Sequence, residues 1–103
     1  MTGAVRFTAA ALADLDETAS WYNEQRPKLG VQFLQAVRET TERIAVNPKA
    51  FQIVAEDVRR ANLPRRWPYA LWYVMSADDS IVIAALHHRR DARLARVRKP
   101  DLG

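Results

Sequence analysis

The residues of this 103-residue chain that are best suited to chemistry gather after its last apolar run, in the sequence His87-His88-Arg89-Arg90. Histidine ordinarily titrates near neutral pH, so the pair is the acid–base equipment that the chain offers. Arginine beside it can stabilise the negative charge that develops on a phosphate during its transfer or cleavage. If the chain cleaves phosphodiesters, these four residues are the expected catalytic group; otherwise no catalytic residue is expected.

The two histidines are expected to point to opposite faces of a strand, because successive strand side chains alternate. One would be packed or hydrogen-bonded inside the domain, and the other would face the basic surface. Adjacent strand residues cannot converge on one ion and the chain has no cysteine, so neither a metal site nor a cofactor is expected. A purely structural role for both histidines is the alternative.

Basic residues are concentrated in the second half of the chain. Residues 1–50 hold six basic and six acidic side chains, whereas residues 58–100 hold ten basic and three acidic ones. A local excess of positive charge favours an anionic partner, and a solvated basic face without a partner is the alternative. The residues expected to contact such a partner are Arg59, Arg60, Arg65, Arg66, His88, Arg89, Arg90, Arg93 and Arg96.

These arginines are expected to differ in their surroundings. Arg59 and Arg60 alternate across a predicted strand, so one of them can pair with a helix carboxylate such as Glu39 or Glu42. The loop arginines Arg65 and Arg66 lie between prolines and are expected to be solvated. The densest basic run, over residues 89–99, either contacts a partner or forms a solvated end of the chain.

Two amphipathic helices are predicted ahead of Pro48. Thr8 can cap the first helix, whose expected buried face is Leu12, Leu15, Ala19 and Tyr22. Pro27 and Gly30 break the pattern. The second helix has an expected buried face of Leu34, Val37, Thr41 and Ile44, and it ends at Asn47-Pro48. Two helices joined by so short a break form an antiparallel hairpin.

After Pro48 the apolar period changes to two, which predicts strands. The candidates are residues 51–54, 58–63, 69–75 and 80–86, with an edge strand at 5–7. A single α+β domain over residues 1–103 is therefore expected, in the order β-α-α-β-β-β, with an N-terminal helix hairpin packed on a small, mainly antiparallel sheet. Tyr69, Trp72 and Tyr73 are expected in the sheet core, yet nothing in the chain covers the second sheet face, so Trp72 is also a candidate for exposure.

Three features together resemble the RelE/ParE toxin family of type II toxin–antitoxin systems. They are the hairpin ending in Asn47-Pro48, the pattern Arg59-Arg60-x-x-Leu63 followed by Trp67-Pro68-Tyr69-Ala70-Leu71-Trp72-Tyr73, and the run from Ile81 to Asp91 that ends near Arg96 and Arg98. The resemblance covers nearly the whole chain. It implies a small toxin that a cognate antitoxin holds inactive, with growth arrest and plasmid stabilization as its consequences.

The family has two branches. RelE-like members cut messenger RNA on the ribosome without a metal, and ParE-like members inhibit DNA gyrase without being enzymes. The nuclease pattern has an arginine directly after the first tyrosine of the central strand and a tyrosine near the C-terminus, where this chain has Ala70 and about Leu94. The resemblance therefore favours the gyrase-directed branch. A ribosome-dependent nuclease and an inactive antitoxin-binding adaptor are the alternatives.

The partners follow from this resemblance. A small, acidic, ParD-like antitoxin is expected to bind in a hetero-oligomer, and DNA gyrase, or else the ribosome and mRNA, is the expected target. The side chains expected to contact the antitoxin are Trp21, Tyr22, Trp67 and Trp72. The start of the chain does not resemble a signal peptide and no apolar run reaches the length of a membrane span, so a cytoplasmic location without membrane contact is expected.

Overall fold

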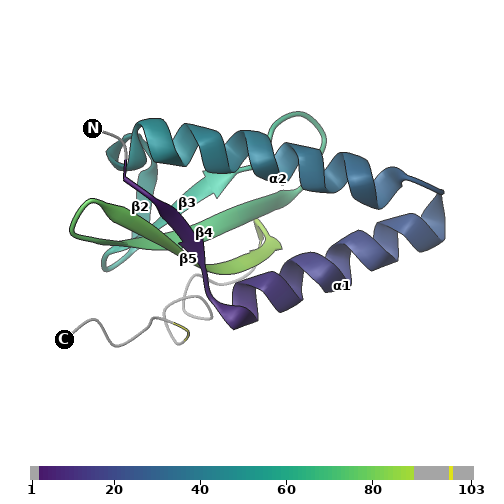
Figure 1. Ribbon diagram of the computed structural model, residues 1–103, viewed down its shortest axis with the longest axis horizontal. Helices are drawn as coiled ribbons and strands as arrows, with labels where there is room; N and C mark the ends of the chain where they lie inside the picture. The colour runs from purple at the N-terminus through teal and green to yellow at the C-terminus, as the bar shows by residue number, and fades with distance from the viewer. Residues whose placement is uncertain (1–2, 90–97, 99–103) are drawn as a thin grey trace.

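A computed structural model describes residues 3–89 and residue 98. A helix hairpin lies against one face of a five-stranded sheet (Figure 1). The elements are β1 (Val5–Phe7), α1 (Ala9–Gln25), α2 (Leu29–Val46), the 3-10 helix η1 (Pro48–Ala50), β2 (Gln52–Ala55), β3 (Val58–Asn62), β4 (Tyr69–Ser76) and β5 (Asp79–His87). This confirms the α+β class and the four strand candidates after Pro48, so the expected order β-α-α-β-β-β is one strand short.

The sheet is mainly antiparallel, as expected. Its strand order is β1-β5-β4-β3-β2, and only β1 runs parallel to its neighbour, β5. Because β1 ends at Phe7 and the chain turns into α1, no strand among the described residues pairs with the last residues of β5 on that side. A bulge lies between β4 and β5 where the register shifts at Trp72/Tyr73.

The helix hairpin closes through small residues. The hydroxyl of Thr8 accepts the backbone N–H of Ala11 at 3.2 Å, so this residue caps α1 as expected. The expectation that Gly30 breaks the helical pattern is wrong, because it lies in the first turn of α2. A Cβ on Gly30 would lie 2.3 Å from the carbonyl oxygen of Ala19, so the glycine permits close contact between α1 and α2.

The buried helix faces agree only in part with the expected ones: Leu15, Ala19, Val37 and Ile44 are buried as expected, and Thr40 is buried in place of Thr41. Ala11, Leu15 and Ala19 are buried on α1, and Gly30, Phe33, Ala36, Val37, Thr40 and Ile44 are buried on α2. Leu12 and Leu34, which the sequence placed on these faces, are exposed. Small residues form much of the contact because they allow the backbones to approach, so the larger side chains at neighbouring positions turn outward.

Each face of the sheet carries its own apolar cluster. Leu71 and Tyr73 of β4 pack with the helices, whereas Ala70, Trp72 and Val74 point to the opposite face. Only 1% of the surface of Trp72 is exposed, so its expected exposure is wrong and its place in the core is confirmed. The guanidinium of Arg60 lies 5.9 Å from the centre of the Trp72 ring and covers part of this second face.

Candidate functional site

The histidine pair is stacked rather than divided between two faces. The rings of His87 and His88 are 4.8 Å apart at an angle of 18°, which overturns the expected alternation. The reason is that β5 ends at His87. Beyond that point the backbone N–H of His88 donates to the carbonyl of Pro68 at 2.9 Å, and its Nδ1 donates to the same oxygen at 2.8 Å. One histidine is thus hydrogen-bonded to the domain, as expected.

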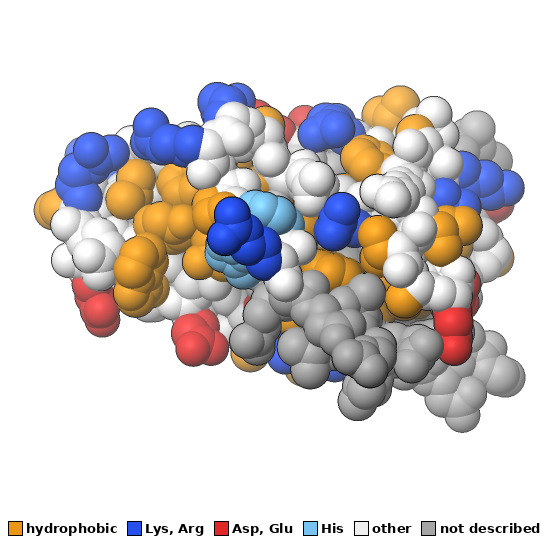
Figure 2. Space-filling view, turned by 180° about the vertical axis from the view of Figure 1, so that it is seen from behind, with side chains coloured by type: hydrophobic (Ala, Val, Ile, Leu, Met, Phe, Trp, Pro, Cys, Tyr) orange, Lys and Arg blue, Asp and Glu red, His pale blue; other side chains and the backbone are white. Residues whose placement is uncertain are grey.

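His87 has an environment that keeps its ring neutral. Its Nδ1 accepts the backbone N–H of Arg89 at 3.1 Å, and its ring meets that of Tyr69 edge-on at 5.7 Å. Burial, followed by the charges of His88 and Arg89, lowers the pKa of His87 below its usual 6.5. The His87 ring is therefore a proton acceptor at neutral pH. In Figure 2 the histidine pair reaches the molecular surface beside basic side chains.

The loop between β3 and β4 holds two arginines in different settings. The Arg65 side chain is solvated as expected, with 60% of its surface exposed, and it also pairs with Glu39 of α2 at 3.1 Å. Arg66 lies over the Trp67 ring at 5.7 Å and forms no ion pair with the described carboxylates. The Pro68 carbonyl that holds His88 belongs to the same loop, which brings the histidine pair and the loop arginines into one region.

The two strand arginines do not share this region. Arg59 and Arg60 point to opposite sides of β3, as expected, but neither pairs with Glu39 or Glu42. Arg59 instead donates to the backbone carbonyls of Lys49 and Phe51, at 3.1 and 2.7 Å. Its guanidinium ties β3 to η1 and the start of β2, a structural role, while Arg60 covers the second apolar cluster. The expected single basic surface is therefore divided.

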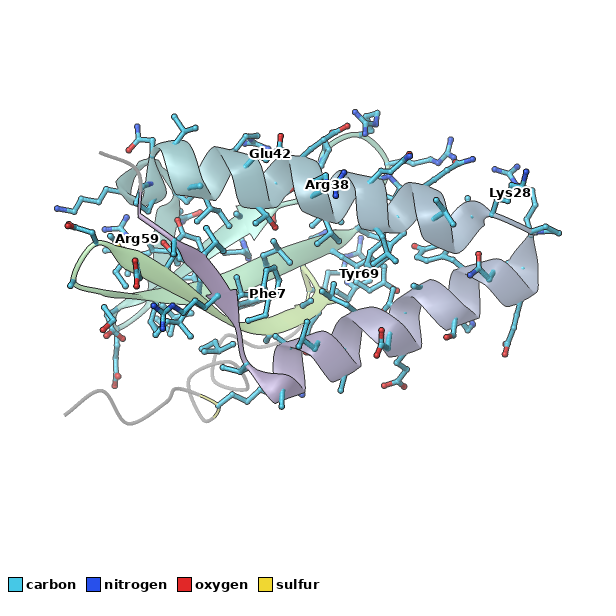
Figure 3. The ribbon with its side chains drawn as sticks, in the orientation of Figure 1. Phe7, Lys28, Arg38, Glu42, Arg59 and Tyr69 are labelled. Atoms are coloured by element: carbon cyan, nitrogen blue, oxygen red, sulfur yellow. The ribbon has the colours of Figure 1, made fainter. Side chains whose placement is uncertain are left out.

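The aromatic residues expected to meet a partner are mostly internal. Trp67 is only 7% exposed and Trp72 is 1% exposed, so their indole rings present little surface in this conformation. Tyr22 is half-buried and contacts the Trp67 and Tyr69 rings. Burial raises its pKa to about 12, with a smaller contribution from Tyr69. Figure 3 shows Tyr69 between the sheet and the helices. Trp21, which is 51% exposed, is the residue of this set that a partner can reach.

A cavity of about 410 Å³ lies where α1 meets the last residues of β5. Its walls include Trp21, Tyr69 and His87, together with Asp14, Glu17, Thr18, Ala85, Leu86 and Arg98. Asp14 is the central polar residue: its Oδ2 accepts the Ala85 N–H at 3.0 Å and the Arg98 guanidinium at 2.5 Å. The cavity thus brings a neutral imidazole, a phenol and charged groups together.

Sequence reasoning missed the role of Asp14, whose side chain is only 10% exposed. It lies beyond the first turn of α1, which contains no acidic residue. The signal was its position three residues after Ala11 and one before Leu15, on the edge of the buried stripe. An aspartate there needs a partner, and the free N–H of the neighbouring strand supplies one.

Three of the expected target-contact residues, Arg90, Arg93 and Arg96, lie outside the described residues. Within residues 3–89 and 98, no group of three histidine or acidic side chains is placed to hold a metal ion. Neither of the two described helices is long and apolar enough to cross a lipid bilayer.

Two solved structures have a fold similar to that of this chain. A solved structure described as the chromosomal ParDE toxin–antitoxin system from P. aeruginosa has a TM-score of 0.72 at 20% identity, over 84% of this chain and 96% of that chain. The toxin–antitoxin complex RelBE2 from Mycobacterium tuberculosis gives 0.62 at 22% identity, over 85% of this chain and 100% of that chain. These likenesses show the fold.

Compared with the sequences of curated proteins, the chain has no match. The model of the family described as the ParE toxin of the type II toxin–antitoxin system parDE, however, matches residues 5–93. Because this match spans most of the sequence, the chain belongs to the ParE toxin family of type II toxin–antitoxin systems.

Proposed function

We propose that this chain is a toxin that inhibits DNA gyrase and that a cognate antitoxin, encoded beside it, neutralises it in a hetero-oligomeric complex. The match to the ParE toxin family over residues 5–93 carries the proposal. Both solved structures of similar fold are described as toxin–antitoxin systems or complexes, which supports an antitoxin partner. Release of the toxin would arrest growth, its gene pair would stabilise a plasmid that carried it, and its target would place it in the cytoplasm.

Ala70 favours gyrase inhibition over RNA cleavage. In the nuclease branch of the family that the sequence resembles, the equivalent position holds an arginine. Here Ala70 is fully buried within the second apolar cluster, beside Trp72 and Val74. A cation at this place would lose its hydration without gaining an ion partner from that cluster. The position is thus unsuited to stabilising a phosphate, and a non-catalytic toxin needs no such group.

RNA cleavage is the second candidate because His87 lines the cavity between α1 and β5. Its lowered pKa keeps it neutral at pH 7, and its Nδ1, which accepts the Arg89 N–H, can take a proton from a 2′-hydroxyl group once that hydrogen bond is released. The Arg89 side chain is exposed beside it and is free of ion pairs with the described carboxylates. These two residues, with His88 and Arg90, would form the site of a metal-independent nuclease.

One pair of assays separates the two candidates. The purified chain is added to a gyrase supercoiling reaction and, separately, to a coupled translation reaction whose message is mapped for cuts. Loss of supercoiling with intact message is expected. Cut message with normal supercoiling would replace the proposal by the nuclease, and His87→Gln should then abolish cutting. No effect in either reaction, together with normal growth on expression, would leave an antitoxin-binding adaptor.

Contacts between the basic residues and gyrase are part of the same proposal. Arg66 and Arg89 are the described residues best placed for it, because both are exposed and unpaired with described carboxylates. Charge removal at either one should weaken inhibition of supercoiling, and so should Arg90→Ala. Arg59→Ala should instead lower the stability of the fold, because Arg59 holds two backbone carbonyls.

A further inference from the structure

Strand β2 forms an edge of the sheet, and no strand among the described residues pairs with its outer side. The proposed function does not use this edge, since β3 and β4 separate it from β5 and the histidine pair. Proteins protect exposed edges with charged side chains or proline, and the β2 sequence Gln-Ile-Val-Ala contains neither. The edge is therefore open to another strand. β2 is short and its register with β3 shifts between Ile53 and Ala55, so side-chain contacts must add to main-chain pairing.

Apolar side chains are exposed along the helix side of this edge. Ile53 is 50% exposed, and Val46, at the end of α2, is 73% exposed. Val54 packs in the apolar cluster of the opposite sheet face, so Ile53 beside it points to the helix side. The register agrees, because Ile53 lies level with Arg59 and Tyr73, and Tyr73 packs with the helices. The edge thus presents apolar surface on the side of the sheet that α2 covers.

A hollow of about 710 Å³ continues this apolar surface at the end of α2. Its apolar walls are Val46, Ala50 and Phe51. Its other walls carry both signs of charge, from Glu39, Glu42 and Arg43. Phe51 packs with the helix-side cluster, which is the side to which Ile53 points. We call Val46, Ala50, Phe51 and Ile53 the β2 strip; its hollow and its exposed side chains fit an apolar surface of matching shape.

The charges at the two ends of β2 have opposite sign. Lys49 is exposed just before the strand, and Glu56 and Asp57 are exposed in the turn that follows it. When two copies of this strand run antiparallel, the lysine of each copy lies nearest to the acidic turn of the other. A parallel arrangement would set like charges together. Charge complementarity therefore favours a second copy of this chain in the antiparallel direction.

Symmetry and charge also select the register. A twofold axis perpendicular to the sheet must pass beside a residue that pairs with its own copy, because paired residues project from the same face. Ile53 and Val54 are the central residues of β2. With Ile53 on the axis, counting along the chain brings Lys49 toward Asp57 of the second copy. With Val54 on the axis, Lys49 would approach Arg59, a like charge, so the register centred on Ile53 is favoured.

We infer that β2 pairs antiparallel with the β2 of a second copy of this chain, about a twofold axis at Ile53. Such an interface uses the same surface on both copies. The two sheets then continue into each other, and the two β2 strips meet on the helix side, where Ile53 and Val46 lose contact with water. Because β3 and β4 separate this edge from β5, both histidine sites stay clear of the contact. The inference goes beyond the proposed function and does not depend on it.

The test measures the mass of the whole chain, without any partner, by analytical ultracentrifugation at concentrations from about 1 to 100 μM, where an interface of modest size dissociates. A dimer that dissociates on dilution is expected. Ile53→Lys sets two cations against each other at the axis and should raise the dissociation constant by at least about 100-fold, and Lys49→Glu should raise it by about tenfold. The matched control Val31→Lys changes an equally exposed residue near the other end of α2 and should leave the constant within about twofold.

Cysteine crosslinking tests the register, since the chain has no cysteine of its own. Directly opposed residues of an antiparallel pair have Cα atoms about 4.5–5.5 Å apart, which a disulfide can span. Ile53→Cys should therefore give an oxidised dimer. In the same register the two copies of Gln52 lie about 8 Å apart, so Gln52→Cys should remain unlinked under the same conditions.

The outcomes are distinct. A dimer that Ile53→Lys abolishes, while this variant keeps native thermal unfolding and Val31→Lys still dimerises, supports the inference. A native chain that stays monomeric at 100 μM overturns it, and so does a dimer of equal stability in Ile53→Lys. A monomeric chain whose binding to the antitoxin is weakened by Ile53→Lys would assign the edge to a strand of that partner instead. Because the chain is measured alone, failure of the dimer leaves the proposal of gyrase inhibition in place.

Discussion

Replacing Gly30 by alanine tests how the helix hairpin is built, because two effects of opposite sign meet at this residue. In an unconstrained helix, alanine is more stable than glycine by about 1 kcal/mol. Here the added Cβ would lie 2.3 Å from the Ala19 carbonyl oxygen and 2.7 Å from the Asn23 side chain, distances that real Cβ atoms do not tolerate. The first contact is with backbone, so the helices must separate.

The cost of forcing an extra carbon into a tight contact is typically about 1–3 kcal/mol, which exceeds the gain in helix propensity. We therefore expect Gly30→Ala to lower the unfolding free energy by about 1 kcal/mol, and the melting temperature by about 4–8 °C for a domain of this size. Urea unfolding followed by tryptophan fluorescence and by circular dichroism measures the change.

The matched control is Ala13→Gly on the exposed side of α1. It measures the propensity effect alone and should destabilise the fold by about 1 kcal/mol. If steric contact at Gly30 were unimportant, Gly30→Ala would stabilise the fold by the amount that Ala13→Gly destabilises it. Such mirrored results would refute the close approach of α1 and α2 at this point.

Three further predictions concern groups with specific partners. Asp14→Ala should lower the unfolding free energy measured by urea unfolding by about 2–3 kcal/mol, because it removes the acceptor of two hydrogen bonds, one of them from Arg98. Asp14→Asn keeps an oxygen acceptor and should therefore lower the unfolding free energy by less. Burial raises the Tyr73 pKa from 10.0 to about 12, so its contribution is complete below pH 10 and is lost as the pH rises to 12. Unfolding measured at pH 9 and pH 11 should therefore show a smaller difference in Tyr73→Phe than in the native chain. For His87, the NMR titration midpoint should lie below 6.5 and should rise in Arg89→Gln. Because the pKa of His87 is lowered in the folded state, the contribution of His87 to stability is present above pH 6.5 and is lost as the pH falls through that midpoint. An unchanged midpoint in the variant would remove the Arg89 charge as a cause.

The elements of this fold could be predicted from the sequence because their boundaries have local causes. Thr8 starts α1 through its hydroxyl, and the bond before Pro48 ends α2. The buried faces were less predictable, because hydrophobicity favours Leu12 and Leu34 whereas the fold buries alanines and Gly30. A close helix contact depends on small side chains that let the two backbones approach, and a pattern of hydrophobic residues does not reveal where such a contact forms.

The histidine pair shows a second limit of prediction from sequence. Alternation applies only within a strand, and the location of the last strand residue decides whether His88 follows it. The carbonyl of Pro68, twenty residues earlier in the chain, captures both the backbone and the ring of His88. Backbone acceptors carry no residue-type signal, so neither this contact nor the two carbonyls that hold Arg59 were predictable from composition.

Charge counting along the chain was the weakest guide to the candidate surface, since an arginine acts on a partner only when its own fold leaves it unpaired. Arg65 is paired with Glu39 and Arg98 with Asp14, both carboxylates from the half of the sequence that is neutral by count. Arg26, from that neutral half, is left without such a partner in the described part of the chain. Among the described residues, pairing across the fold thus leaves Arg26 available at the hairpin tip, and a partner that recognises charge should be sensitive to Arg26 although no local excess of basic residues surrounds it in the sequence.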